Sequence, residues 1–131
     1  MLNRVETIDK IIKFFDVQKS FGMEGGSGNG CSYITGNGDR CAIGCLMTEA
    51  EAILAEFELG ADDVWSIHHH AISKGDDERF PFLTSIDEDD CYFLSDLQMY
   101  HDTASCKVGK LGLEESLELF KQQLELDKLK Y

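Results

Sequence analysis

The chain has 131 residues with 25 acidic against 12 basic side chains, and its formal charge of −13 opposes binding to duplex DNA or to an anionic membrane. A hydrophobic content of 43% suffices for one buried core, so we expect a single domain over residues 1–131. No apolar run has the length of a membrane span, and residues 1–10 carry charges of both signs. We therefore expect a soluble, cytoplasmic protein whose five cysteines are thiols.

The first expected element is an amphipathic helix over residues 4–20, in which Val5, Ile8, Ile12 and Phe15 recur at helical spacing. Residues 22–30 then contain five glycines, and glycine is costly inside regular structure. This segment lacks the preceding strand and the lysine of a phosphate-binding loop. A simple loop is therefore the preferred interpretation, with a nucleotide-cradling loop as the alternative.

Residues 31–47 are predicted to form a β-hairpin. Two short apolar runs flank residues 36–39, and the Asn37-Gly38 pair between them favours a tight turn. The second run, 40–47, is small or apolar at successive positions, which is typical of a strand covered on both faces. The predicted fold is therefore α+β, with a small antiparallel hairpin or short sheet packed against about five helices.

Two helices are expected after the hairpin. Thr48 and Glu51 form a capping-box pattern that starts a helix running to about residue 58 and ending at Gly60. Asp62 is a candidate N-cap for a helix over 63–73. The residues expected to face inward are Ile53, Leu54 and Phe57 in the first of these helices, and Val64, Ile67, His68, Ala71 and Ile72 in the second.

The last third of the chain is predicted to contain a loop and two helices. Residues 75–84 carry the single proline and are expected to form a loop, after which Ser85 and Glu88 form a second capping-box pattern. The helix that starts there should end near residue 103, with His101 on its inward face. The final helix is expected over 113–128, where leucines and Phe120 recur at the period of an α-helix.

Two segments resemble a known group of proteins. The string from Gly38 to Leu46, together with the downstream string from Leu94 to Asp102, is similar to a pattern in small uncharacterised proteins encoded by bacteriophages and prophages. That group has no assigned activity, so the resemblance implies a setting, the bacterial host cytoplasm, and no catalytic residue.

One hypothesis for chemistry is a cysteine-dependent hydrolase or transferase. Cys45 lies just before an expected helix N-terminus, where the helix dipole can lower a thiol pKa. His101 would act as its base, with Asp102 or Gln98 orienting the imidazole. The alternative is a core histidine and a buried free thiol, each satisfied by the backbone.

No metal or other cofactor is expected. On a strand, Cys41 and Cys45 would lie roughly 13 Å apart, too far to share one zinc ion. The consecutive histidines 68–70 point in different directions on a helix, and the acidic residues lack the spacing of a calcium loop.

The preferred functional hypothesis is a non-enzymatic, phage-type acidic binding protein that occupies a bacterial host or defence component, either a protein or a small ligand. Its acidic cluster and its phenylalanine loop are the expected contact surface, because acidic side chains favour a basic partner and exposed apolar side chains need cover. A further alternative is a sponge for a charged nucleotide that uses Arg40 and the glycine loop. The candidate contact residues for a protein partner are Asp76, Asp77, Phe80, Phe82, Asp89 and Asp90.

Overall fold

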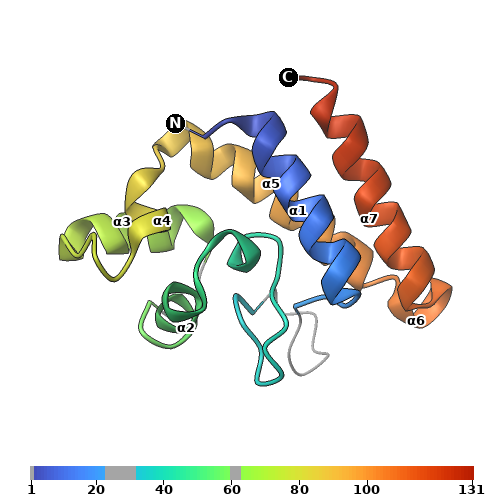
Figure 1. Cartoon of the computed structure of the whole chain (residues 1–131), viewed down its shortest axis with the longest axis horizontal. Helices are drawn as coiled ribbons and strands as arrows, with labels where there is room; N and C mark the ends of the chain where they lie inside the picture. The colour runs from blue at the N-terminus through green and yellow to red at the C-terminus, as the bar shows by residue number, and fades with distance from the viewer. Residues whose placement is uncertain (1, 23–31, 60–62) are drawn as a thin grey trace.

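The computed structural model describes residues 2–22, 32–59 and 63–131, and every regular element in these ranges is helical (Figure 1). The described residues contain no β-strand, so the predicted α+β fold and its hairpin are wrong. Two short helices, α4 and α6, were also not predicted. The elements are α1 (Arg4–Gln18), the 3-10 turn η1 (Gly44–Leu46), α2 (Glu49–Phe57), α3 (Val64–Lys74), α4 (Pro81–Ser85), α5 (Glu88–Ser105), α6 (Val108–Leu111) and α7 (Leu113–Lys128).

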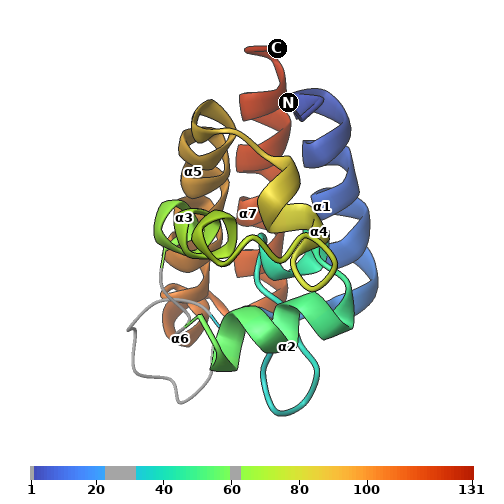
Figure 2. The ribbon, with the colours of Figure 1, turned by 90° about the vertical axis from the view of Figure 1, so that its left-hand side faces the viewer.

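Three long helices form the main body of the molecule (Figures 1 and 2). Helix α7 packs against both α5 and α1 and runs antiparallel to α1. Helix α3 packs against α5 and α4, and with α2 these shorter helices cover one end of the body. The segment 32–47 lies between the two groups, where η1 contacts α1.

Four helices begin at a polar side chain that satisfies a free backbone N–H. The caps are Asn3, Thr48, Asp63 and Asp87, which start α1, α2, α3 and α5. The capping box of α5 joins Asp87 to Asp90, two residues later than the predicted box. Asp62 and Gly60, predicted as a cap and a stop, lie outside the described residues.

The buried faces of α1 and α7 follow the predicted spacing in part, but the buried face of α2 does not. Ile8, Phe15, Leu117, Phe120 and Leu124 are buried, whereas Val5 and Ile12 are half-buried and Leu113 is 41% exposed. Phe15 and Phe120 are each 1% exposed and their rings meet at 5.1 Å in the core. In α2 the buried residues are Glu51, Ala52 and Ala55, whereas Ile53 is 40% and Phe57 78% exposed. The inward face of α2 therefore consists of two alanines and a carboxylate, and its exposed side carries larger apolar residues.

The predicted turn is present at residues 35–39, but it does not lead into a strand pair. The Gly38 N–H donates to Thr35 O at 2.9 Å, and Gly38 has a φ of 87° that suits glycine. Beyond it, the chain coils: the Cys45 N–H donates to Cys41 O at 3.0 Å, as in a helical turn. The strand-based separation of the two cysteines was therefore wrong, because this segment is not extended.

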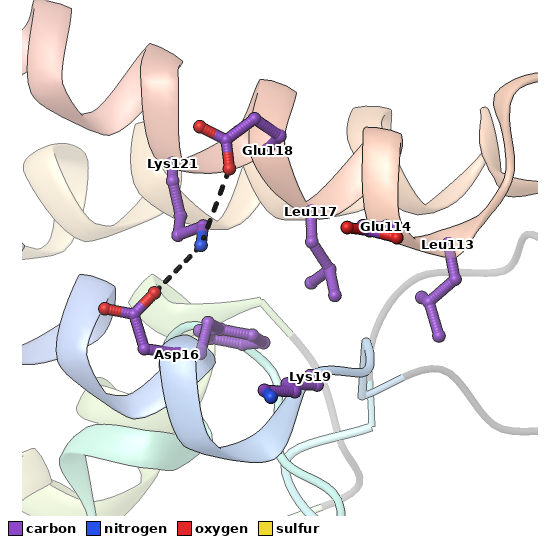
Figure 3. A pocket seen from close by; sticks show the side chains of 8 residues that line it. Asp16, Lys19, Leu113, Glu114, Leu117, Glu118 and Lys121 are labelled. Atoms are coloured by element: carbon purple, nitrogen blue, oxygen red, sulfur yellow. Dashed lines mark hydrogen bonds and ion pairs between the residues drawn. The ribbon is translucent and has the colours of Figure 1, made fainter.

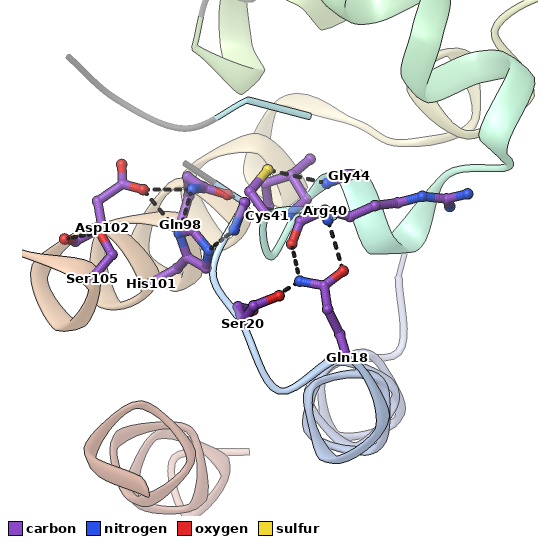
Figure 4. Close-up of polar contacts among 11 residues, drawn as sticks. Gln18, Ser20, Arg40, Cys41, Gly44, Gln98, His101, Asp102 and Ser105 are labelled. Carbon is purple, nitrogen blue, oxygen red and sulfur yellow. Dashed lines mark hydrogen bonds and ion pairs between the residues drawn. The ribbon is translucent and has the colours of Figure 1, made fainter. Parts of the chain in front are cut away.

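Glutamine side chains take the place that a partner strand would have had. The Gln18 amide pairs with both backbone groups of Arg40, accepting from its N–H at 2.7 Å and donating to its carbonyl at 2.8 Å (Figure 4). Gln98 Oε1 accepts from the Ile43 N–H at 3.2 Å. Arg40 and Ile43 therefore have hydrogen-bond partners from α1 and α5 without forming a sheet.

A buried carboxylate explains how residues 81–85 become helical instead of remaining a loop. Glu51 is 1% exposed, and its two oxygens accept from the Phe82 and Leu83 N–H groups at 3.0 and 2.8 Å. These N–H groups lie in the first turn of α4, directly after Pro81. Glu51 thus caps a neighbouring helix instead of closing the predicted box with Thr48, and burial raises its pKa.

Replacing Gly44 by alanine should destabilise the fold, because an added Cβ would lie 1.9 Å from Tyr33 O. The backbone has to move, and we expect the free energy of unfolding to fall by about 1–3 kcal/mol, as for other overpacked sites. Chemical denaturation of the purified variants measures this change. Gly109→Ala in α6 is the matched control, since its Cβ would meet nothing within 4 Å; equal losses in both variants would contradict the packing explanation.

Candidate functional site

The predicted His101 and Asp102 lie in a hydrogen-bonded network on α5 (Figure 4). His101 Nε2 accepts from the Gly22 N–H at 3.2 Å, so the ring proton is on Nδ1. Nδ1 lies 3.0 Å from Asp102 Oδ1 and donates to it. Gln98 Nε2 donates to the same oxygen at 2.8 Å. Every polar atom of the imidazole is therefore satisfied within the fold.

Burial explains why His101 is neutral. The side chain is 0% exposed and is surrounded by the rings of Phe15, Phe21 and Phe120, with centroid distances of 5.1–5.7 Å. Desolvation lowers the pKa of His101, while the hydrogen bond to Asp102 opposes that change. His101 is thus a neutral core histidine that ties α5 to the segment after α1.

Cys45 is also committed to the backbone. Its thiol donates to Ala42 O at 3.1 Å, and only 7% of the residue is exposed. Desolvation by burial, with a smaller contribution from Cys41, raises the pKa of Cys45 well above its usual value. The cysteine is held as a thiol, which is a poor nucleophile.

The structure provides each half of the proposed catalytic pair with other partners. His101 contacts Gly22 and Asp102, while Cys45 contacts Ala42. The base and its orienting carboxylate match the expected arrangement, but the base nitrogen that would face a nucleophile already accepts a backbone N–H. This geometry favours a structural role for the network.

Arg40 holds residues 40–47 in place through its backbone and its side chain. Its backbone pairs with Gln18, and its guanidinium Nη1 donates to Met47 O at 2.9 Å across η1. Most of the glycine loop that would accompany it in a nucleotide site, residues 23–30, lies outside the described residues. The nucleotide-sponge hypothesis therefore has only Arg40 as a described candidate contact, and that side chain is engaged locally.

The residues predicted for a protein-binding surface divide into buried and exposed groups. Phe80 and Asp90 are 0% exposed, and Asp90 accepts from the Leu2 N–H as well as closing the capping box of α5. Phe82 is half-buried, and Asp76 pairs with Arg79 at 3.5 Å. Asp77 and Asp89 are exposed. Only part of the predicted acidic cluster is therefore available to a partner.

Sequence reasoning missed an exposed aromatic surface beside this cluster. Trp65 is 43% exposed, and its ring stacks on His69 with centroids 4.1 Å apart. His69 Nε2 lies 3.2 Å from Glu88 Oε1, which joins α3 to the first turn of α5. One helical turn further, Tyr92 is 63% exposed. We define the α3/α5 surface as Trp65, His69, Glu88, Asp89 and Tyr92.

Two other kinds of site are absent from the described parts of the chain. No helix in these ranges combines the length and hydropathy of a membrane span. Nor do the described residues bring three or more histidine, cysteine or acidic side chains together in a metal-binding group. No protein-family model, curated protein or solved structure matches the chain.

Thiol labelling separates the structural role of Cys45 from the catalytic one. At mildly alkaline pH a water-soluble thiol reagent should modify Cys106 rapidly, because that residue is exposed. It should modify Cys45 slowly, because this thiol is buried and protonated. Cys91 should also react slowly, since burial raises its pKa to about 11. Mass spectrometry of digested samples gives the rate at each site. Rapid modification of Cys45 in the native protein would instead favour the hydrolase hypothesis.

The buried His101 predicts a loss of stability in weak acid. The pKa of His101 in the folded state lies below the ordinary value of 6.5. Its stabilisation of the fold is therefore complete above pH 6.5 and is lost as the pH falls toward the pKa of the folded state. Protonation would also place two donors, Nε2–H and Gly22 N–H, against each other. Between about pH 7 and pH 5, the melting temperature of the wild type should therefore fall more steeply than that of His101→Gln. This range contains the pKa of the unfolded state. Parallel curves would contradict this assignment.

Proposed function

We propose that this protein is an acidic binding protein that occupies a basic protein of a bacterial cell through the α3/α5 surface. The observation that supports the proposal is the pair of exposed side chains Trp65 and Tyr92, with the half-buried His69, beside Glu88 and Asp89. Tryptophan and tyrosine are enriched among residues that dominate binding energy at protein interfaces. Carboxylates at their edge attract a basic partner and repel acidic competitors.

The charge of the whole chain supports the same partner class. A formal charge of −13 creates a negative field that accelerates encounter with a basic protein and disfavours duplex DNA. The field acts at long range, whereas the aromatic side chains contribute after contact. The resemblance of the two sequence segments to small phage proteins supports a host or defence protein as the target.

The cysteine hydrolase is the less favoured function. Its nucleophile is a buried thiol bonded to Ala42 O, and its base nitrogen accepts from Gly22. Catalysis would require both contacts to break before Cys45 and His101 could interact. Binding through the α3/α5 surface requires no such rearrangement, because Trp65 and Tyr92 are already exposed to solvent.

Removing the two large aromatic side chains tests the proposal. We expect Trp65→Ala/Tyr92→Ala to weaken capture of the partner from bacterial lysate by at least tenfold, roughly the loss of one strong interface contact. Phe57→Ala is the matched control, because Phe57 is a 78% exposed aromatic residue on α2, outside this surface. Quantitative mass spectrometry of the retained proteins, followed by calorimetry with the purified partner, measures the change.

Charge reversal tests the electrostatic part separately. Glu88→Lys/Asp89→Lys should slow association and reduce its dependence on salt, while dissociation changes little, because peripheral charges mainly steer encounter. Stopped-flow kinetics at two salt concentrations gives both rates. A partner that binds the aromatic double variant as tightly as the wild type would exclude the α3/α5 surface as its site.

A further inference from the structure

A second surface, separate from α3 and the start of α5, lies on the outer side of the α1/α7 pair (Figure 3). Two adjoining hollows of about 720 and 670 Å³ follow the line between the helices and share Asp16, Glu118 and Lys121. Lys121 Nζ lies 2.8 Å from Asp16 and 3.6 Å from Glu118, so it bridges the helices where the hollows meet. We call the two hollows together the α1/α7 groove.

The groove has an apolar lining that the fold leaves open. Phe15 and Leu117 lie at its inner side. Leu113, Leu126 and Leu129 border it and are 41%, 60% and 82% exposed. Leu126 and Leu129 lie on the side of α7 opposite to Phe120 and Leu124, which are buried in the core, so this helix is apolar on two sides. A helix with this pattern is normally covered on both sides.

The dimensions of the groove suit a helix. The lining residues of α7 extend from position 113 to position 129, roughly 24 Å at 1.5 Å per residue. A partner helix of about 16 residues covers that length, with apolar side chains against Phe15 and Leu117 in one hollow and against Ile12 and Leu129 in the other. A short straight helix fits here because α1 and α7 run side by side along the same line.

The charges along the groove select the kind of helix. Its lining contains Asp16, Glu114, Glu118 and Glu125 against Lys19 and Lys121. A second copy of the chain would bring a further charge of −13 to this acidic face. A helix with lysine or arginine beside its apolar face would meet opposite charges instead, because both sides of the groove carry carboxylates.

We infer that the α1/α7 groove binds a basic amphipathic helix from a partner protein. The exposed pair between Lys121 and Asp16 contributes little to folding and is free to exchange for a pair with an incoming arginine. The inference does not depend on the α3/α5 surface, because the two surfaces share no residue.

A synthetic peptide provides a direct test. The probe is a labelled 16-residue peptide with leucines at positions i, i+3, i+4 and i+7 and lysine or arginine beside them; a second peptide has the same composition in scrambled order. Fluorescence anisotropy should show the amphipathic peptide binding the wild-type protein, and the scrambled peptide binding at least tenfold more weakly. Leu126→Lys/Leu129→Lys should reduce binding of the amphipathic peptide by at least tenfold.

The matched control keeps charge and exposure equal. Val17→Lys/Phe57→Lys also replaces two exposed apolar residues by lysine, with 83% and 78% exposure, but neither residue lines the groove. Its affinity for the peptide should stay within about threefold of that of the wild type. Both double variants add the same charge, so any difference between them does not come from long-range electrostatics. Equal weakening in the two double variants, or equal binding of the scrambled peptide, would overturn the inference. Sedimentation showing a dimer that Leu126→Lys/Leu129→Lys abolishes would also overturn it, in favour of a second copy.

Discussion

The packing of this fold depends on two glutamine side chains that replace a strand. Residues 40–43 lie between α1 and α5, where the N–H and carbonyl of Arg40 and the N–H of Ile43 need partners that the backbone of a helix does not offer. The amides of Gln18 and Gln98 each offer a donor and an acceptor, as a peptide group does. An irregular segment can therefore cross a helical core without leaving these backbone groups unsatisfied.

His101 completes this arrangement from the opposite side. Its ring belongs to an aromatic cluster, yet its two nitrogens connect the Gly22 backbone to Asp102 at the edge of the core. A phenylalanine would fill similar volume but leave the Gly22 N–H without a partner. The histidine is thus suited to a core position where one side must be apolar and the other must accept a hydrogen bond. The same requirement accounts for its resemblance to a catalytic base.

The sequence was sufficient to predict helix bounds and inward-facing residues where one apolar face determines which side of the helix is buried. The bounds of the final helix were predicted as residues 113–128, because its leucines and Phe120 repeat over four turns with little ambiguity. The inward direction of His101 was predicted for the same reason. In α2 the same rule failed, since the buried face holds Glu51, Ala52 and Ala55 while Ile53 and Phe57 are exposed.

The hairpin and the binding surface required information that local patterns do not contain. The Asn37-Gly38 turn was recognisable, but the partners of residues 40–43 come from positions 18 and 98. Phe80 and Asp90 looked available for binding because the sequence gives no sign of the core or of Leu2 covering them. Trp65 and Tyr92 become one surface only through the packing of α3 on α5. Tertiary contacts decided each of these cases.

The bond between Gly22 and His101 joins positions 79 apart in the chain, and that separation has a kinetic meaning. Neighbouring helices such as α6 and α7 meet through short loops, whereas closing a long loop has a larger entropic cost before its contact forms. The contact between α1 and α7 closes a longer loop still, since Asp16 and Lys121 are 105 positions apart. We therefore expect helices α3 to α7 to assemble first through their shorter connections, with α1 and residues 20–22 docking onto them later.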